Sequence, residues 1–263
     1  MRLKDKVAVI CGASDEFAQA IALGYAREGA KLYLQDFADA EKRLARVEAE
    51  VRKATPHVAS GLFDIARAEP VAAMTRDIMA RHGQIDILVN ASSGGWHGML
   101  FDAKEGDWDK AIDRGLKAYF LTSQAIGKEM ARRGSGKIIN ITSIVGKLGS
   151  GGAIVWGAAR GGVDAMTAAL AQGLGQYGIN VVALARGASD MTPYPAEAKA
   201  ERLRRLPFGR LGNAEDIVGP AIFLATEEAR WIAGSVIYCD GGYVTAAATD
   251  AEHRVTEVPY RGP

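Results

Sequence analysis

Short apolar runs rich in β-branched residues alternate along the chain with longer segments whose apolar positions recur at helical spacing. The runs predict strands and the longer segments predict helices. The predicted strands cover residues 6–11, 30–36, 57–65, 85–91, 136–144, 179–185 and 235–242. The predicted helices cover residues 17–28, 38–54, 68–82, 105–132, 153–176 and 214–226, the last with Asn213 as its N-cap.

Strands separated by helices of this length predict an α/β fold, a Rossmann-type doubly wound parallel sheet of about seven strands with helices on both faces. There is no internal repeat or linker, so we expect a single domain over residues 1–245. The remaining residues, 246–263, lack clear periodicity, and we expect a tail that is disordered or reaches a subunit interface.

Composition narrows the function classes. The 32 basic and 31 acidic residues nearly balance, which argues against nucleic acid or a membrane surface as a partner. No apolar run approaches the roughly 20 residues that span a bilayer, and the N-terminus lacks the pattern of a signal peptide. Cys11 and Cys239 resemble buried apolar residues of a reducing compartment, and the four histidines form no cluster, so no metal is expected. We therefore expect a cytoplasmic protein.

The first predicted strand ends in CGASDEFAQAIA, where a dinucleotide-binding protein has a glycine-rich turn. Glycines in that turn let the backbone approach a pyrophosphate held at the helix N-terminus. Here only Gly12 is a glycine, and Asp15 and Glu16 bring negative charge. Acids at this position stabilise a helix dipole, but they would also repel a pyrophosphate.

Further polar residues follow the next predicted strands. Asp36 ends the second strand, where a carboxylate can accept hydrogen bonds from the ribose hydroxyls of NAD and would repel the 2′-phosphate of NADP. NAD(H) is therefore expected in preference to NADP(H). Asp64 and Asn90 follow the third and fourth strands, although all three residue types also cap helices and turns in proteins without a cofactor.

Together these segments resemble the classical short-chain dehydrogenase/reductase family across nearly the whole chain. The resemblance is most specific in LPFGRLGNAEDIVGPAIFLATEEARWIAGSVIYCDGGY. DILVNASS is similar to the family's Asn-Asn-Ala-Gly segment, FDI to its segment after the third strand, and NITSIVG to its strand that carries the catalytic serine. The resemblance implies a dinucleotide site formed by Gly12, Ser14, Phe17, Asp36, Asp64, Ile65, Asn90, Arg160 and Gly187.

The family's usual catalytic set is Asn-Ser-Tyr-Lys, and this chain departs from it. Ser143 matches the catalytic serine, but Trp156 stands at the tyrosine position and Arg160 at the lysine position. Gly115 stands at the asparagine position. The second and third glycines of the nucleotide turn become Glu16 and Ala18, and the usual Pro-Gly after the sixth strand is Arg186-Gly187.

The replacements change what the site can do. An indole N–H only donates and a guanidinium stays charged, so neither Trp156 nor Arg160 carries a proton at pH 7. Their four-residue spacing places them on one helix face, where a cation–π contact is the simplest expectation. His97 and Tyr194 are candidate substitutes for the missing acid, although both residue types are also common in ordinary loops.

Three functions fit this sequence. The first is an oxidoreductase with altered chemistry that binds NAD(H) and a small carbonyl, alcohol or enoyl substrate. The second is a non-redox enzyme on the same scaffold, similar to halohydrin dehalogenases or acting as a cyclase or isomerase. The third is a catalytically silent assembly subunit. The resemblance also implies a homodimer or homotetramer formed through helices 105–132 and 153–176.

Overall fold

A computed structural model describes residues 1–246, which form one seven-stranded sheet. The strands are β1 (Val7–Cys11), β2 (Lys31–Asp36), β3 (Val58–Leu62), β4 (Ile87–Asn90), β5 (Gly136–Ser143), β6 (Ile179–Arg186) and β7 (Val236–Cys239). Their order is β3-β2-β1-β4-β5-β6-β7, and every neighbouring pair is parallel. The predicted doubly wound parallel sheet is therefore confirmed.

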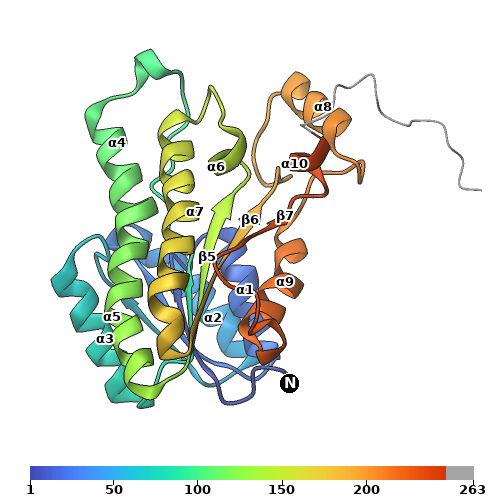
Figure 1. Cartoon of the computed structure of the whole chain (residues 1–263). Coiled ribbons are helices and arrows are strands. Elements are labelled where there is room, and N and C mark those ends of the chain that lie inside the picture. Colours follow the sequence, from blue (N-terminus) through green and yellow to red (C-terminus); the bar gives the residue numbers. More distant parts are fainter. Residues whose placement is uncertain (247–263) are drawn as a thin grey trace, which may run out of the picture.

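Helices cover both faces of this sheet (Figure 1). One face carries α1 (Glu16–Arg27), α2 (Glu41–Ala54) and α9 (Val218–Ala225), and the other carries α3 (Ala68–His82), α4 (Glu105–Ile112), α5 (Ala118–Arg133) and α7 (Ile154–Leu174). The short α6 (Val145–Leu148), α8 (Ala196–Arg205) and α10 (Tyr243–Ala246) lie above the carboxyl ends of the strands in Figure 1. No helix within residues 1–246 is both long and apolar enough to cross a membrane.

Two apolar layers hold the helices to the sheet. Strands β1, β4 and β5 are buried along their whole length, as expected for a parallel sheet covered on both faces. Tyr25 of α1 packs in one layer, where its hydroxyl donates to the Ala221 carbonyl of α9 at 2.9 Å. Met74 of α3 and Ile126 of α5 pack in the other layer.

Two predicted helices differ in detail from the structure. The segment expected as one helix over 105–132 is interrupted by a π-helical turn at Asp113–Lys117, which includes Gly115. The segment expected over 214–226 begins as a 3₁₀ turn, Ala214–Ile217, before α9 continues it. Asn213 is the predicted N-cap, and its Oδ1 accepts the backbone N–H groups of Glu215 and Asp216.

Two other expectations have different outcomes. Cys11 is fully buried as expected, but Cys239 is only half-buried, and its thiol contacts the Asp216 carbonyl at 3.1 Å. The expected tail, 246–263, lies outside the described residues except for Ala246, which ends α10. Its expected disorder or interface role therefore stays a prediction.

The sheet order locates the edge at which a ligand site is expected. The chain moves outward from β1 to β2 and β3 and then returns to place β4 on the other side of β1. In open parallel sheets the crevice at the carboxyl ends of two such strands is the usual binding position. The predicted site residues Gly12, Asp36, Asp64 and Asn90 follow or end β1, β2, β3 and β4 at this edge.

Candidate active site

The turn after β1 keeps the one feature that requires glycine. Gly12 has φ of +75°, and a Cβ built on it would lie 2.5 Å from the Ser92 Cα. Its N–H donates to the Gln35 carbonyl at 2.9 Å, which fixes the turn against β2. Asp15 then caps α1, because its Oδ1 accepts the Phe17 N–H at 3.0 Å. Asp15 thus has the ordinary capping role, and Glu16 adds a second acid to the same turn.

Asp36 is buried at the end of β2 and faces the nucleotide turn. Its Oδ2 accepts the Ser14 N–H at 2.8 Å, and its Oδ1 accepts the Phe37 N–H at 2.8 Å. An ionised carboxylate offers about four acceptor positions, so two remain for further donors. This arrangement suits the two vicinal hydroxyls of a ribose.

The other predicted cofactor residues of β3 and β4 contribute in different ways. Asp64 is exposed, and its Oδ1 accepts the Ala66 N–H at 3.2 Å, so Asp64 shapes the turn after β3. Ile65 is fully buried. The Asn90 amide points inward, donating to Asn140 at 2.9 Å and accepting from the Thr122 hydroxyl at 2.7 Å. Asn90 therefore ties β4 to β5 and α5, and its side chain is not free to contact a cofactor.

Ser143 ends β5 beside Arg186, which ends β6. The two residues are register partners in the parallel β5–β6 ladder, so their side chains project from the same face of the sheet. The Ser143 side chain is almost fully buried, and its only recorded contact among the described residues is the Val145 N–H at 3.5 Å. No base within the described contacts activates this hydroxyl. Ser143 can therefore donate a hydrogen bond to a substrate oxygen but cannot act as a nucleophile by the usual route.

Arg160 projects from α7 into the protein interior. Only 3% of the residue is exposed, and Nη1 donates to the Tyr119 hydroxyl at 2.8 Å and the Ile141 carbonyl at 3.0 Å. Nη2 donates to the Ser92 carbonyl at 3.1 Å. These bonds join α7 to α5, β5 and the loop after β4. The expected role of Arg160 in holding a ribose thus competes with a structural role that already uses both terminal nitrogens.

The Trp156 ring contacts two guanidinium groups. Arg160 lies 5.8 Å from the Trp156 ring centre, which confirms the cation–π contact expected from the four-residue spacing. Arg186 lies 5.3 Å from the same ring and 4.6 Å from the Phe17 ring of α1. Arg186 therefore bridges the nucleotide turn and the wall formed by α7. The Trp156 Nε1 is buried and has no hydrogen-bond partner among the described residues.

The two candidate proton carriers lie in different surroundings. His97 packs its ring edge against Trp156, with 5.3 Å between ring centres. Its partial burial lowers its pKa below the ordinary value of 6.5, and the charge of Arg186 lowers it further, so the neutral form is favoured at pH 7. Tyr194 instead stacks under Arg202 at 4.1 Å and packs against Leu206, which supports ordinary loop packing.

The last two predicted positions are glycines. Gly115 lies within the π-helical turn, and a Cβ there would approach the Ala159 Cβ at 3.4 Å, which is an ordinary contact. Gly187 is held by packing, since a Cβ there would lie 2.6 Å from the Asp240 Cα. Its N–H already donates to the Cys239 carbonyl at 3.1 Å, so Gly187 connects β6 to β7.

Sequence reasoning missed three functional features of this edge. It recorded Arg186 only as a departure from Pro-Gly, although a charge that ends a buried strand is an unusual signal. It did not predict that the Tyr119 hydroxyl accepts a hydrogen bond from the Arg160 guanidinium. It also did not identify Arg43 of α2, whose Nε lies 3.4 Å from the Ser14 hydroxyl. Arg43 is distant from Gly12 in sequence and reaches the turn only through the fold.

Two cavities lie at opposite edges of the sheet. A cavity of about 410 Å³ at the carboxyl edge is lined by Phe17, Arg186, Ser189, Tyr238 and Asp240 among others. Arg186 is therefore one of the residues that line this cavity. Within residues 1–246 no group of three or more His, Cys, Asp or Glu side chains could hold a metal ion.

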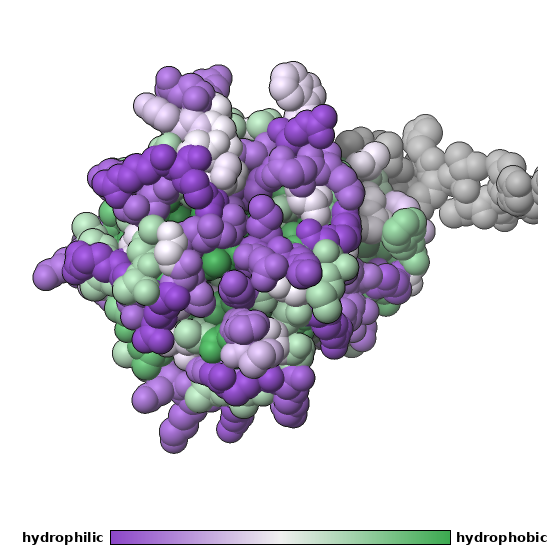
Figure 2. Space-filling view, turned by 90° about the horizontal axis from the view of Figure 1, so that it is seen from below, coloured by the Kyte–Doolittle hydropathy of each residue, from purple (hydrophilic) through white to green (hydrophobic). Residues whose placement is uncertain are grey.

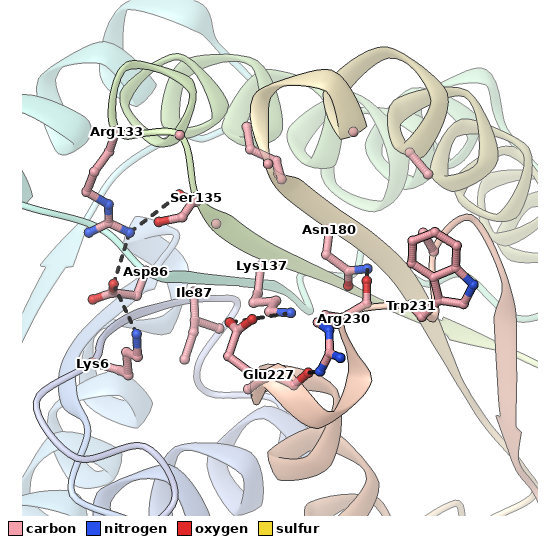
Figure 3. Close-up of a pocket in the computed structure, with 18 residues that line it drawn as sticks. Lys6, Asp86, Ile87, Arg133, Ser135, Lys137, Asn180, Glu227, Arg230 and Trp231 are labelled. Atoms are coloured by element: carbon pink, nitrogen blue, oxygen red, sulfur yellow. Dashed lines mark hydrogen bonds and ion pairs between the residues drawn. The ribbon is translucent and has the colours of Figure 1, made fainter.

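The second cavity, of about 520 Å³, lies at the amino ends of the strands (Figure 3). The face seen from that side is dominated by hydrophilic side chains (Figure 2). Asp86 stands between Arg133 at 2.9 Å and Lys6 at 3.9 Å, and Lys137 pairs with Glu227 at 3.7 Å (Figure 3). The charges here are paired with one another, whereas Arg186 beside Trp156 has no ion pair among the described residues.

Comparisons with known proteins agree with this architecture. A family model described as enoyl-(acyl carrier protein) reductase matches residues 12–244. The 3-oxoacyl-(acyl-carrier-protein) reductase FabG of Staphylococcus aureus is 35% identical over 240 residues, which cover 90% of this chain and 97% of that protein. The (2S)-((R)-hydroxy(phenyl)methyl)succinyl-CoA dehydrogenase subunit BbsD of Thauera aromatica is 34% identical over 245 residues, covering 92% and 98%.

A solved structure shows the same similarity in three dimensions. The gluconate 5-dehydrogenase of Burkholderia cenocepacia, solved in complex with NADP and tartrate, matches with a TM-score of 0.87 and 29% identity. The match covers 93% of this chain and 97% of that one. On the matching family model, the identity to its relatives and the shared sheet, this chain belongs to the short-chain dehydrogenase/reductase family of oxidoreductases.

Proposed function

We propose that this chain binds NAD(H) at the carboxyl edge of the sheet and acts on a small carbonyl, alcohol or enoyl substrate by chemistry that does not use the family's Tyr-Lys pair. The observation that carries the proposal is the position of Asp36. Its carboxylate is fixed by two backbone N–H groups directly beside the Gly12 turn and retains acceptor positions. Family membership supplies the reaction class.

The adenosine half of a dinucleotide fits the residues present. Asp36 would hold the ribose hydroxyls, Ser14 would lie beside the pyrophosphate, and Asp64 with Ile65 would border the base. Asp15 and Glu16 oppose the pyrophosphate charge. Burial lowers the pKa of the Arg186 guanidinium, and the nearby Asp15 carboxylate counteracts part of that lowering. Arg186 thus offsets part of the negative charge of this turn.

The preference for NAD(H) over NADP(H) follows from the same carboxylate. A 2′-phosphate would lie beside Asp36, and like charges at such short range are strongly unfavourable. Arg43 is the opposing feature, because its side chain reaches the same turn and could pair with a phosphate. Asp36 is buried while Arg43 is exposed, so the carboxylate dominates through weaker solvent screening.

At the reaction end, the chain's own residues orient a substrate oxygen. A bound nicotinamide supplies the hydride acceptor or donor. The Ser143 hydroxyl and the Trp156 Nε1–H can each donate to the substrate oxygen, and His97 is the residue beside Trp156 that can carry a proton near pH 7. Arg160 keeps α7 in place through its bonds to the interior and does not take part in proton transfer.

Binding measurements on the full chain test the proposal. Calorimetric titration should show NADH binding more tightly than NADPH, and Asp36→Ala should remove most of that preference. Loss of two ribose hydrogen bonds to a charged acceptor corresponds to about tenfold or more in the dissociation constant of NADH. Failure of all four nicotinamide nucleotides, oxidised and reduced, to bind the wild-type chain would refute the proposed function.

A matched control separates a local effect from a general loss of charge. Glu41→Gln removes an exposed carboxylate from the first turn of α2, near the same edge but without a proposed contact to the cofactor. It should leave the dissociation constants of NADH and NADPH unchanged. An equal effect of Asp36→Ala and Glu41→Gln would reduce the role of Asp36 to long-range electrostatics.

A further inference from the structure

The guanidinium of Arg186 is the unexplained charge of this site. Among the described residues it makes no side-chain hydrogen bond and no ion pair, and its recorded contacts are the rings of Phe17 and Trp156. A guanidinium has five N–H donors and no way to release its proton at neutral pH. Placing such a group against two aromatic rings removes water without supplying acceptors, which is costly unless a ligand supplies them.

A second guanidinium adds positive charge beside Arg186. Arg160 contacts the same Trp156 ring and is buried, and although it donates to three neutral acceptors it has no carboxylate within ion-pair range among residues 1–246. Its charge lowers the pKa of Arg186, as does burial, while Asp15 opposes both effects. Asp164 is the other acid near Arg160, and its own burial raises its pKa. The site therefore has excess positive potential.

Additional donors lie next to Arg186. Ser143 is its register partner on β5, and the Trp156 Nε1 is buried without a partner although nine-tenths of the indole is covered. A hydroxyl, an indole N–H and a guanidinium fork in one place form a donor set that suits an oxyanion. Arg186 also retains partial exposure and borders the 410 Å³ cavity, so a ligand can reach it.

We propose that Arg186 binds a carboxylate group of the substrate, beside the reacting oxygen to which Ser143 and Trp156 Nε1 donate. The inference deepens the proposed function, on which it rests for the identity of this edge as the reaction site. The substrate class is then a small carboxylic acid that also bears the reacting carbonyl or hydroxyl group. The planar fork of Arg186 would hold the carboxylate between the Phe17 and Trp156 rings.

The pyrophosphate of the cofactor is the competing source of an oxyanion. Arg186 contacts Phe17 of the nucleotide turn as well as Trp156, and its register position beside Ser143 is the observation that favours the substrate. Arg186 also lies close enough to His97 to lower its pKa. Ser143 and His97 both belong to the reaction side of the site.

The test measures binding of pyruvate and succinate by calorimetry, each against its uncharged amide, with inorganic pyrophosphate as a separate ligand. We expect the acids but not the amides to bind the wild-type chain. Arg186→Gln should weaken acid binding by about tenfold to a hundredfold, and Arg186→Lys should restore it only in part because it keeps charge without the fork. Arg202→Gln removes a guanidinium that also stacks on an aromatic ring, but outside the site, and should change nothing.

Several results would overturn the inference. One is that the acids bind the wild type and Arg186→Gln equally well. A second is that acids and amides bind equally well. A third is that pyrophosphate is the one ligand whose affinity depends on Arg186. Titration of NADH into the same variants separates this inference from the proposed function. If NADH fails to bind while acid binding depends on Arg186, the carboxylate site stands and the proposed function falls. If NADH binds and neither acid binds, the proposed function stands and the carboxylate site is refuted.

Discussion

Arg160 and Arg186 show how differently two arginines on one tryptophan ring can behave. Arg160 donates to a hydroxyl and two carbonyls and connects four parts of the fold, whereas Arg186 has only ring contacts among the described residues. A buried charge with fixed acceptors stabilises the folded state, but a shielded charge without acceptors does not. The same residue type thus has a structural role at one position and a ligand-binding role at the other.

This contrast predicts that substitutions at the two arginines change the free energy of unfolding differently. Arg160→Met should lower the free energy of unfolding by about 2–4 kcal/mol, because three charge-assisted hydrogen bonds disappear from a buried site. Arg186→Met should leave it unchanged or raise it. Urea denaturation followed by circular dichroism measures both. A large loss of stability in Arg186→Met would show that its ring contacts are structural and would weaken the carboxylate proposal.

His97 gives a second prediction at the residue scale. Burial and the charge of Arg186 place its folded-state pKa below 6.5, so Arg186→Gln should raise that pKa toward its ordinary value. Proton NMR titration of the imidazole C–H signals measures the shift. An unchanged His97 pKa in Arg186→Gln would mean that the two groups do not interact.

The same shift has a consequence for stability against pH. A histidine whose folded pKa is depressed binds fewer protons in the folded than in the unfolded state, so its favourable contribution is complete above about pH 6.5 and is lost as the pH falls. His82 is shifted in the same direction by burial. The free energy of unfolding should therefore decrease below pH 6.5, and His97→Gln should reduce that decrease without removing the part due to His82.

At the scale of elements, the turn between β1 and α1 shows how a partly rebuilt motif keeps its shape. Gly12→Ala should destabilise the fold by about 3 kcal/mol or more, because its positive φ disfavours a side chain and the new Cβ meets the Ser92 backbone. Dinucleotide binding should be lost with it. Thermal denaturation and NADH titration measure the two effects.

A second glycine serves as the control for that turn. Gly106 lies in α4 with no atom within 4 Å of a built Cβ, so Gly106→Ala should raise stability by about 0.5–1 kcal/mol. Equal effects of Gly12→Ala and Gly106→Ala would mean that the β1–α1 turn has no special requirement for glycine.

The elements also show what the sequence could and could not predict. The apolar runs predicted all seven strands, and the clearest of them, β1, β4 and β5, are buried along their whole length, whereas β3 and β7 are partly exposed. Apolar periodicity could not predict the π-helical turn at Asp113–Lys117, since one added residue in a helix hardly alters the pattern. Nor could it predict that the Asn90 amide faces inward, because that depends on Asn140 and Thr122 from distant segments.

At the scale of the whole molecule, we expect assembly from the exposed apolar side chains of the outer helices. Phe120 of α5 and Trp108 of α4 are 45% and 47% exposed, and Ala165 and Ala169 lie on the exposed face of α7. Light scattering after gel filtration should give the mass of two or four chains. Ala165→Glu should shift it toward smaller species, because a desolvated charge opposes close helix contact.

The control for assembly uses an exposed alanine elsewhere. Ala49 lies on the exposed face of α2, which the family resemblance does not place at an interface. Ala49→Glu should leave the mass unchanged. A monomeric wild-type chain at micromolar concentration would contradict the expected homodimer or homotetramer.

The shared contacts of Trp156 with Arg160 and Arg186 also couple the effects of substitutions at these three positions. Changes at touching residues do not add, so the three positions form one epistatic unit. Trp156→Tyr alone would give both guanidinium groups a smaller ring without the indole N–H, and Arg160→Lys alone would lose the planar fork that bonds Tyr119 and Ser92. Restoring the family's usual Tyr-Lys pair therefore requires at least these two changes together, and Arg186 and Gly115 stand at further positions that depart from the family pattern. Either change alone should fail to restore ordinary reductase activity, which makes the present arrangement hard to reverse one residue at a time.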